Sequence, residues 1–292
     1  MSNVQAYKEI PTVSIPQNYQ TQVGPFLAEM YEKHGPIFRS GSFGNEIVFL
    51  VGPEANRFVL VNNRQKFSNY EGWGKMFGIL DMFGRGLLVM DGKEHDEHRR
   101  MMNPAFTISY MNNYLPLMNR IIRERTAQWV KDGTVDIYDE ARKITFDVAA
   151  EALAGLANRA ERDQFRDLFL RILMTPAMAS SEEDFRYKLG LVHRELNDLL
   201  IPKIEERRRH PTNDLFGMLV QARDNQGNTM SNEQLIAHVN ILLVAGHETS
   251  TSLSAWLLYL LNQNPDYTKR VMDEQNALLV HNSFRIVWIL VE

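Results

Sequence analysis

Apolar residues recur at helical spacing through most of the chain after about residue 110. The sharpest stripe joins Phe165, Leu168, Phe169, Ile172 and Leu173, which follow the i, i+3, i+4, i+7, i+8 pattern of a core-facing helix. Shorter stripes are Leu115/Met118/Ile122/Trp129, Ala141/Ile144/Val148 and Val192/Leu196/Leu199/Leu200. Asp132-Gly133, Gly155 and Pro211 are expected to separate these helices. The pattern predicts a helix-rich fold.

The N-terminal part follows a different pattern. Residues 1–25 are polar and carry three prolines, so we expect an extended arm. A short helix over 26–33 should end at Gly35-Pro36, because glycine stops helices and proline cannot continue them. Strands at 37–39 and 46–51, joined by a glycine-rich turn, predict a hairpin, and Pro53 opens a helix over 53–61. The fold class is therefore mainly α with a small N-terminal β corner.

Residues 67–89 contain many glycines and aromatic residues without a clean period. We expect a long loop with one helical turn at most. Long loops in compact domains are often functional, and a packed surface loop is the plain alternative.

A long helix is predicted over residues 231–262. Ser231 and Gln234 form a capping box at its start. The helix is apolar on nearly all sides, so it should be buried along most of its length. Its middle, AGHETST at 245–251, breaks helix rules with a glycine, a glutamate and three hydroxyl residues. Such a break indicates either a kink with satisfied polar groups or a functional site.

The composition excludes several kinds of functional site. The 292 residues contain no cysteine, which excludes disulfides, cysteine-ligated zinc, iron–sulfur clusters and cysteine nucleophiles within this chain. A net charge of −4 disfavours nucleic-acid binding through a general basic field. The basic run at 205–210 is interpreted as a solvated helix end, or else as a patch that docks a partner. His247-Glu248 begins a zinc-protease pattern, but its fifth position is Thr251.

No signal peptide or membrane anchor is predicted. The N-terminus lacks an apolar segment, and polar residues interrupt the most apolar stretch, at 235–261, before it reaches the length that spans a bilayer. We therefore expect a soluble, cytoplasmic protein.

Three segments resemble the cytochrome P-450 monooxygenases. AGHETST resembles the (A/G)-G-x-(D/E)-T-(T/S) pattern of that family's central helix. DGKEHDEHRRMMNPAF at 91–106 resembles its D-G-x-x-(W/H)-x-x-x-R-R-x-x-x-P-A-F segment. YEKHGPIFR at 31–39, followed by the strands and PEANRFVLVNN, is a weaker third match. The likeness covers roughly residues 25–278, so we assign 1–25 to an arm, 26–278 to a cytochrome P-450 domain and 279–292 to an unaligned tail.

The resemblance implies a haem b cofactor (iron protoporphyrin), O2, a small apolar substrate and an external electron-transfer protein such as a ferredoxin, flavodoxin or reductase. His95 and Arg99, four residues apart on one helix face, would contact the haem propionates, unless this is merely a charged surface helix. Ala245 and Gly246 would leave room for dioxygen beside the haem, and Thr249 and Glu248 would organise proton delivery. His247 receives no role. Phe77, Leu80, Phe83 and Leu87 would contact the substrate.

The sequence also departs from the family pattern. The E-x-x-R helix, the β domain and the loop with the haem-ligating cysteine, which should follow the central helix, are not found. Haem iron in this family is held by a cysteine thiolate, so we expect this chain to be an inactive truncation of the fold. The alternatives are a non-catalytic helical fragment that binds haem weakly or a protein partner, and a metal-dependent hydrolase using EHDEH at 94–98.

Overall fold

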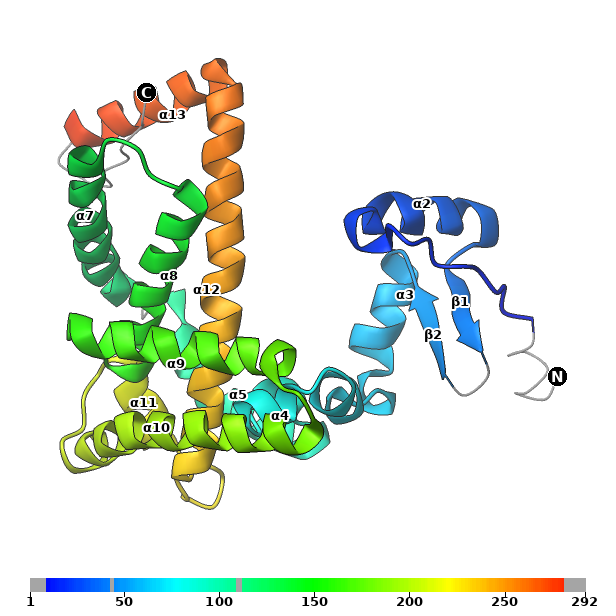
Figure 1. The fold of residues 1–292 in the computed structure, drawn as a ribbon, viewed down its shortest axis with the longest axis horizontal. Helices are drawn as coiled ribbons and strands as arrows, with labels where there is room; N and C mark the ends of the chain where they lie inside the picture. The colour runs from blue at the N-terminus through cyan, green and yellow to red at the C-terminus, as the bar shows by residue number, and fades with distance from the viewer. Residues whose placement is uncertain (1–8, 43–44, 109–111, 281–292) are drawn as a thin grey trace. The chain divides into compact units, whose positions relative to one another are not determined.

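The computed structural model describes residues 9–42, 45–108 and 112–280. The chain divides into two units, one up to Ser68 and one from Asn69 onward. The ribbon in Figure 1 labels the elements of both units. Residues 1–8 of the predicted arm and 281–292 of the predicted tail lie outside the described residues. The rest of the arm is not wholly extended, because it holds a helical turn at Tyr19–Thr21 and the start of a helix at Val23.

The first unit contains the predicted β corner. α2 (Val23–His34) ends at Gly35, whose φ of +81° suits glycine. β1 (Ile37–Ser42) pairs antiparallel with β2 (Asn45–Leu50), with Ile37 opposite Leu50. Phe26, Phe38 and Phe49 pack together beneath the hairpin. Pro53 opens α3 (Pro53–Arg57) as predicted, and the chain then widens into a π-helical turn over Phe58–Asn62.

The prediction of a long loop over 67–89 is wrong. This stretch forms a π-helical turn (Tyr70–Met76), α4 (Ile79–Phe83) and a 3-10 turn (Leu87–Val89). Gly78 and Gly84, with φ of +67° and +81°, flank α4 and change the chain direction at low steric cost. Each helical piece is too short to show a period, which explains why the pattern resembled a loop.

The second unit is helical as predicted. Its long helices are α5 (Gly92–Met102), α7 (Leu115–Asp132), α8 (Ile137–Ala154), α9 (Arg159–Met178), α10 (Glu182–Arg209), α11 (Leu215–Gln221), α12 (Asn232–Gln263) and α13 (Pro265–Val280). The stripe on α9 is buried, because Phe165, Leu168, Phe169 and Ile172 are at most 2% exposed. α10 ends with the basic run, which confirms a helix end there.

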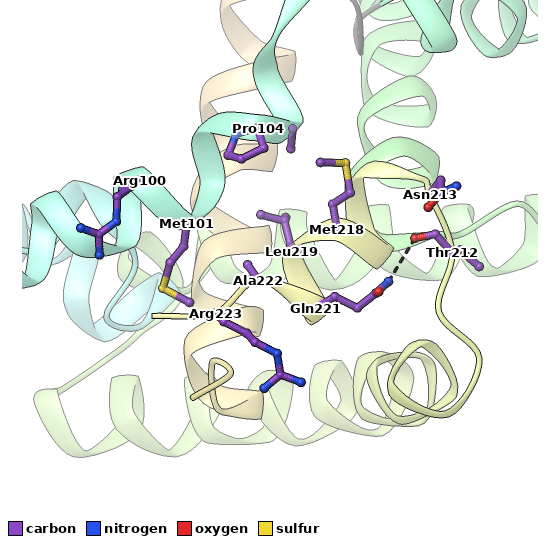
Figure 2. Close-up of a pocket in the computed structure, with 11 residues that line it drawn as sticks. Arg100, Met101, Pro104, Thr212, Asn213, Met218, Leu219, Gln221, Ala222 and Arg223 are labelled. Carbon is purple, nitrogen blue, oxygen red and sulfur yellow. Dashed lines mark hydrogen bonds between the residues drawn. The ribbon is translucent and has the colours of Figure 1, made fainter. Parts of the chain in front are cut away.

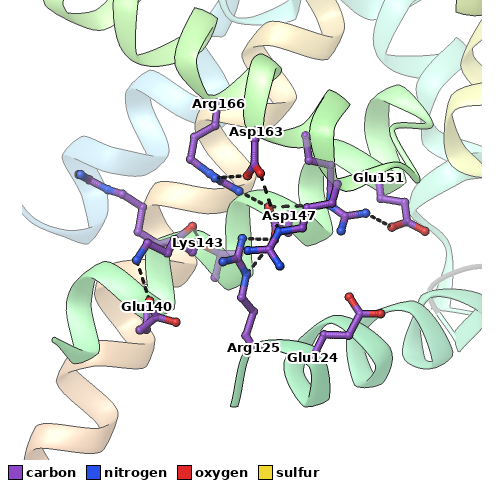
Figure 3. A network of polar contacts seen from close by, with 12 residues as sticks. Glu124, Arg125, Glu140, Lys143, Asp147, Glu151, Asp163 and Arg166 are labelled. Atoms are coloured by element: carbon purple, nitrogen blue, oxygen red, sulfur yellow. Dashed lines mark hydrogen bonds and ion pairs between the residues drawn. The ribbon is translucent and has the colours of Figure 1, made fainter. Parts of the chain in front are cut away.

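An ion-pair network ties α7, α8 and α9 together (Figure 3). Asp147 of α8 is almost fully buried and accepts bonds from Arg125 of α7, at 2.6 Å, and from Arg166 of α9. Arg162 of α9 pairs with Glu151 of α8 at 3.0 Å. Because a buried carboxylate needs cationic partners, this network explains how Asp147 can lie inside the helical unit.

α12 is the long helix that the capping box predicted, and both bonds of the box form at Ser231 and Gln234. α8 packs alongside it, and α13 leaves from its C-terminal end (Figure 1). The prediction of burial along most of its length is wrong for the second half, where Leu253 is 70% and Trp256 58% exposed. Among the described residues, no helix combines the length and apolar character that crossing a membrane requires.

Candidate functional site

The AGHETST segment lies within α12 and presents one open side. Ala245, Gly246 and Thr249 are all exposed. A Cβ added to Gly246 would meet no described atom within 4 Å beyond its own helical turn. The Thr249 hydroxyl donates to the Ala245 carbonyl at 2.8 Å, the backward bond expected of threonine inside a helix. This side of α12 therefore has space for a flat group beside it.

An apolar cavity of about 540 Å³ borders the same side. Ala245 and Gly246 form part of its wall, together with side chains of α7 and α8 that include Met118, Ile144 and Val148. The only polar side chains among its lining residues are hydroxyl groups, and Thr145 and Ser250 are two of them. The cavity can therefore take apolar surface next to the glycine.

Glu248 points toward α8. Its carboxylate lies 3.5 Å from Arg142 of α8 and 3.2 Å from Nε2 of His247. No local pattern in the sequence could predict this ion pair, because Arg142 lies more than a hundred residues before Glu248. The side chain of Glu248 is 32% exposed, so its carboxylate is within reach of solvent.

His247 has a structural role in the packing of α12. Its Nδ1 bonds the Leu243 carbonyl at 2.9 Å, and its ring packs edge-on against Phe146 and Phe169. These contacts join α12 to buried side chains of α8 and α9.

The predicted propionate contacts lie on α5. Arg99 is exposed, and its guanidinium makes no bond or ion pair with any residue that the structure describes. His95 is mostly buried at 19% exposure, and its Nδ1 lies 3.3 Å from an Asp96 oxygen. The neighbouring Arg100 is engaged by Glu97 at 3.4 Å. Arg99 therefore remains available for an anion from outside this part of the chain.

A buried pair of histidines, missed in the sequence, joins α5 to α12. Nδ1 of His98 lies 2.8 Å from Nε2 of His238. Burial first, and the neighbouring His98 second, lower the pKa of His238 to about 4. Burial also lowers the pKa of His98, although Glu94 and Glu97 oppose that shift. His238 stood out as a polar interruption of an apolar stretch, but nothing in the sequence paired it with residue 98.

The four predicted substrate contacts do not share one environment. Phe77 is 55% exposed, and its ring lies at a tilt against Trp73 with the centroids 5.1 Å apart, whereas Phe83 is buried against Phe169 of α9. Leu80 is half-buried, and Leu87 packs at the edge of the helical core. Phe83 is thus a core residue as much as a candidate contact.

A separate cavity of about 340 Å³ lies between the end of α5 and α11 (Figure 2). Arg100 and Arg223 stand at its edge, and Gln221 donates to the Thr212 carbonyl at 3.1 Å. Its described lining includes none of the predicted site residues. The EHDEH segment gains no metal site either, since no group of three or more ligating side chains occurs in the described parts of the chain.

A family model described as cytochrome P-450 matches residues 9–288. The chain belongs to the cytochrome P-450 family. It is 30% identical to cytochrome P-450 136 of Mycobacterium tuberculosis over 262 residues, which are 87% of this chain and 53% of that protein. It is 29% identical to cytochrome P-450 120 of Synechocystis, covering 87% of this chain and 57% of the relative.

Solved cytochromes P-450 share the fold. The cyanobacterial CYP120A1 with bound retinoic acid superposes with a TM-score of 0.72 at 27% identity, covering 92% of this chain and 64% of that one. The mixed-function MycG gives 0.68 at 26% identity, covering 91% and 66%. The chain thus spans about half the length of the curated relatives that it matches.

The family implies haem, and the residues present fit part of its surroundings. The open side of α12 at Gly246 has room for a flat macrocycle, and the unpaired guanidinium of Arg99 suits a carboxylate. The thiolate that ligates haem iron in this family is not among the 292 residues, because they include no cysteine.

Proposed function

We propose that these residues form the oxygen-side wall and the propionate contacts of a cytochrome P-450 monooxygenase site, which inserts one oxygen atom of O2 into a small apolar substrate. The observation that carries the proposal is the free Arg99 on α5 combined with the open Gly246 side of α12. Haem with a thiolate ligand, when bound, supplies the electron density that favours O–O cleavage.

In this proposal the side chains of this chain bind, orient and move protons. Arg99 and His95 hold the two propionates by charge-assisted hydrogen bonds. Ala245 and Gly246 keep the side of the helix flat. The Thr249 hydroxyl, which donates to the Ala245 carbonyl, keeps its lone pairs free to accept a hydrogen bond from water. Glu248, restrained by Arg142, passes protons from solvent.

The apolar cavity beside Ala245 and Gly246 supports an apolar substrate, as does the retinoic acid held by the cyanobacterial relative. Phe77, Leu80, Phe83 and Leu87 stay proposed substrate contacts. Electrons would come from a separate ferredoxin, flavodoxin or reductase. Turnover also needs a thiolate, so we propose that these 292 residues alone do not oxidise substrate.

Haem titration of the purified chain tests the proposal. Arg99→Ala and His95→Ala should each weaken haem binding about tenfold or more, since each removes a charge-assisted hydrogen bond. Arg100→Ala is the matched control, because Arg100 is also an exposed arginine of α5 but is already engaged by Glu97. Equal weakening by Arg100→Ala would contradict the assignment. Oxidised product formed by the haem-loaded chain with O2 and an electron donor would contradict the proposed lack of turnover.

A further inference from the structure

A second cavity of about 540 Å³ lies between α10, the first turns of α12 and the segment that follows α4. It shares no lining residue with the cavity beside Gly246. Phe83, Leu196 and Ile236 give it apolar walls, and Asn240 and His193 add polar groups. The cavity is therefore a compartment distinct from the proposed haem side.

Asn240 leaves a buried acceptor in this compartment. Its side chain is 2% exposed, and Nδ2 donates to the Phe83 carbonyl at 3.5 Å. Oδ1 accepts no bond from any residue that the structure describes. Exchanging the amide nitrogen and oxygen gives no better arrangement, because two oxygens would then face each other at Phe83. A buried acceptor without a donor is destabilising, so such an atom is rare without a function.

The other polar lining residues, among them Asn197, Ser231, Glu233 and Gln234, are half-buried or exposed, so Asn240 is the one fully buried polar side chain in the described lining. Nε2 of His193 lies 2.9 Å from the Met82 carbonyl, so Nε2 carries the hydrogen and Nδ1 presents a lone pair. Arg85 is held by both oxygens of Glu94, at 2.9 and 2.5 Å. The buried part of the compartment thus combines apolar walls with one acceptor that lacks a donor, and it is complementary to an apolar molecule that brings its own donor.

We propose that this compartment is a second ligand site, for an apolar alcohol whose hydroxyl donates to Oδ1 of Asn240 while its hydrocarbon body packs on Phe83, Leu196 and Ile236. An alcohol fits better than an amine, because an ammonium group beside Asn240 would be buried, whereas Glu233, the carboxylate in the lining, is exposed. Binding of the alcohol gives Oδ1 of Asn240 the donor that no described residue supplies. The site requires neither haem nor the proposed reaction, and Phe83 is the one residue that its lining shares with the proposed substrate contacts.

Menthol and its methyl ether are matched probes, because the ether keeps the hydrocarbon body and the oxygen but lacks the donor. Isothermal titration should show one saturable menthol site per chain and about tenfold weaker binding of the ether. No saturable binding, or equal binding of the two probes, would mean that water alone serves Asn240 and would overturn the proposal.

Two variants locate the site. Asn197→Trp fills the compartment from α10 at a half-buried position, and it should abolish menthol binding without changing the thermal midpoint much. Ser254→Trp, which fills the cavity beside Gly246 instead, should leave menthol binding within twofold of the parent. The reverse pattern would place the alcohol on the haem side. Asn240→Leu should make the affinities for menthol and for its ether equal. If Asn240→Leu fails to fold, Asn197→Trp still tests where menthol binds.

Discussion

The two halves of α12 are nearly equal in apolar character but differ in what covers them. In the first half, Leu235, Val239 and Leu243 are at most 1% exposed. In the second half, Leu253 and Trp256 are more than half exposed. The AGHETST segment lies at the boundary, with His247 and Thr251 buried and Thr249 exposed.

The difference shows that burial is a property of neighbours. The first half is enclosed by α10 and by the Phe83–Gly86 segment, whose Gly86 lies against the Ala237 carbonyl. The second half is contacted by α8, where Thr145 bonds Thr251 at 2.7 Å. An apolar surface left open on this scale marks a place for another packing partner.

The largest effect should come from removing a buried side chain of the first half. Leu243→Ala should lower the free energy of unfolding by about 2–5 kcal/mol, because it removes a fully buried leucine and leaves a cavity. Leu253→Ala, the same change in the second half, should cost less than about 0.5 kcal/mol. Urea denaturation followed by circular dichroism measures both, and equal losses would refute the comparison.

The buried His98–His238 pair should make the first half sensitive to acid. The pKa of His238 is about 4 in the folded chain, against an ordinary value of 6.5. Between these values the unfolded state binds a proton that the folded state excludes. The contribution of neutral His238 to the free energy of unfolding is therefore complete above about pH 6.5. About 3 kcal/mol of it is lost as the pH drops toward 4.

His238→Gln isolates this effect. Glutamine keeps a donor for His98 but does not titrate. The charges of Glu94, Glu97 and Arg85 also act on the pair and are present in both proteins, so only the difference between parent and variant is informative. We expect the unfolding midpoint of the parent to approach that of the variant as the pH is lowered from 7 to 5, because only the parent loses stability through His238. Parallel curves would contradict the assignment.

The sequence predicted the helices well, but it did not predict which distant residues contact one another. The Ser231–Gln234 capping box fixed the start of α12, and the 3.6-residue period of α9 identified its buried side, because both signals are local. The pairs Glu248–Arg142 and His98–His238 join residues more than a hundred positions apart, and no local pattern encodes them. The motifs that resemble cytochrome P-450 located the candidate site without showing which side of α12 would be open.

A smaller effect is expected where the chain backbone approaches α12 closely. A Cβ at Gly86 would lie 2.7 Å from the Ala237 carbonyl oxygen and 2.9 Å from Cγ1 of Ile241. Gly86→Ala should therefore lower the free energy of unfolding by about 1–3 kcal/mol through overpacking. Gly72→Ala is the matched control, since a Cβ there meets nothing within 4 Å. Thermal unfolding of the two variants should differ clearly, and similar midpoints would argue against the close approach.

The smallest change in stability, and the clearest change in behaviour, should come from the exposed half. Leu253→Lys with Leu260→Lys replaces two exposed leucines by a residue of similar helix propensity, so the free energy of unfolding should change by less than about 0.5 kcal/mol. Self-association measured by sedimentation should decrease, because apolar surface is removed. Asn262→Lys with Gln263→Lys adds the same charge on the same helix but keeps both leucines. If this control reduces self-association equally, added charge rather than lost apolar surface explains the effect. The exposed half of α12 would then not drive association.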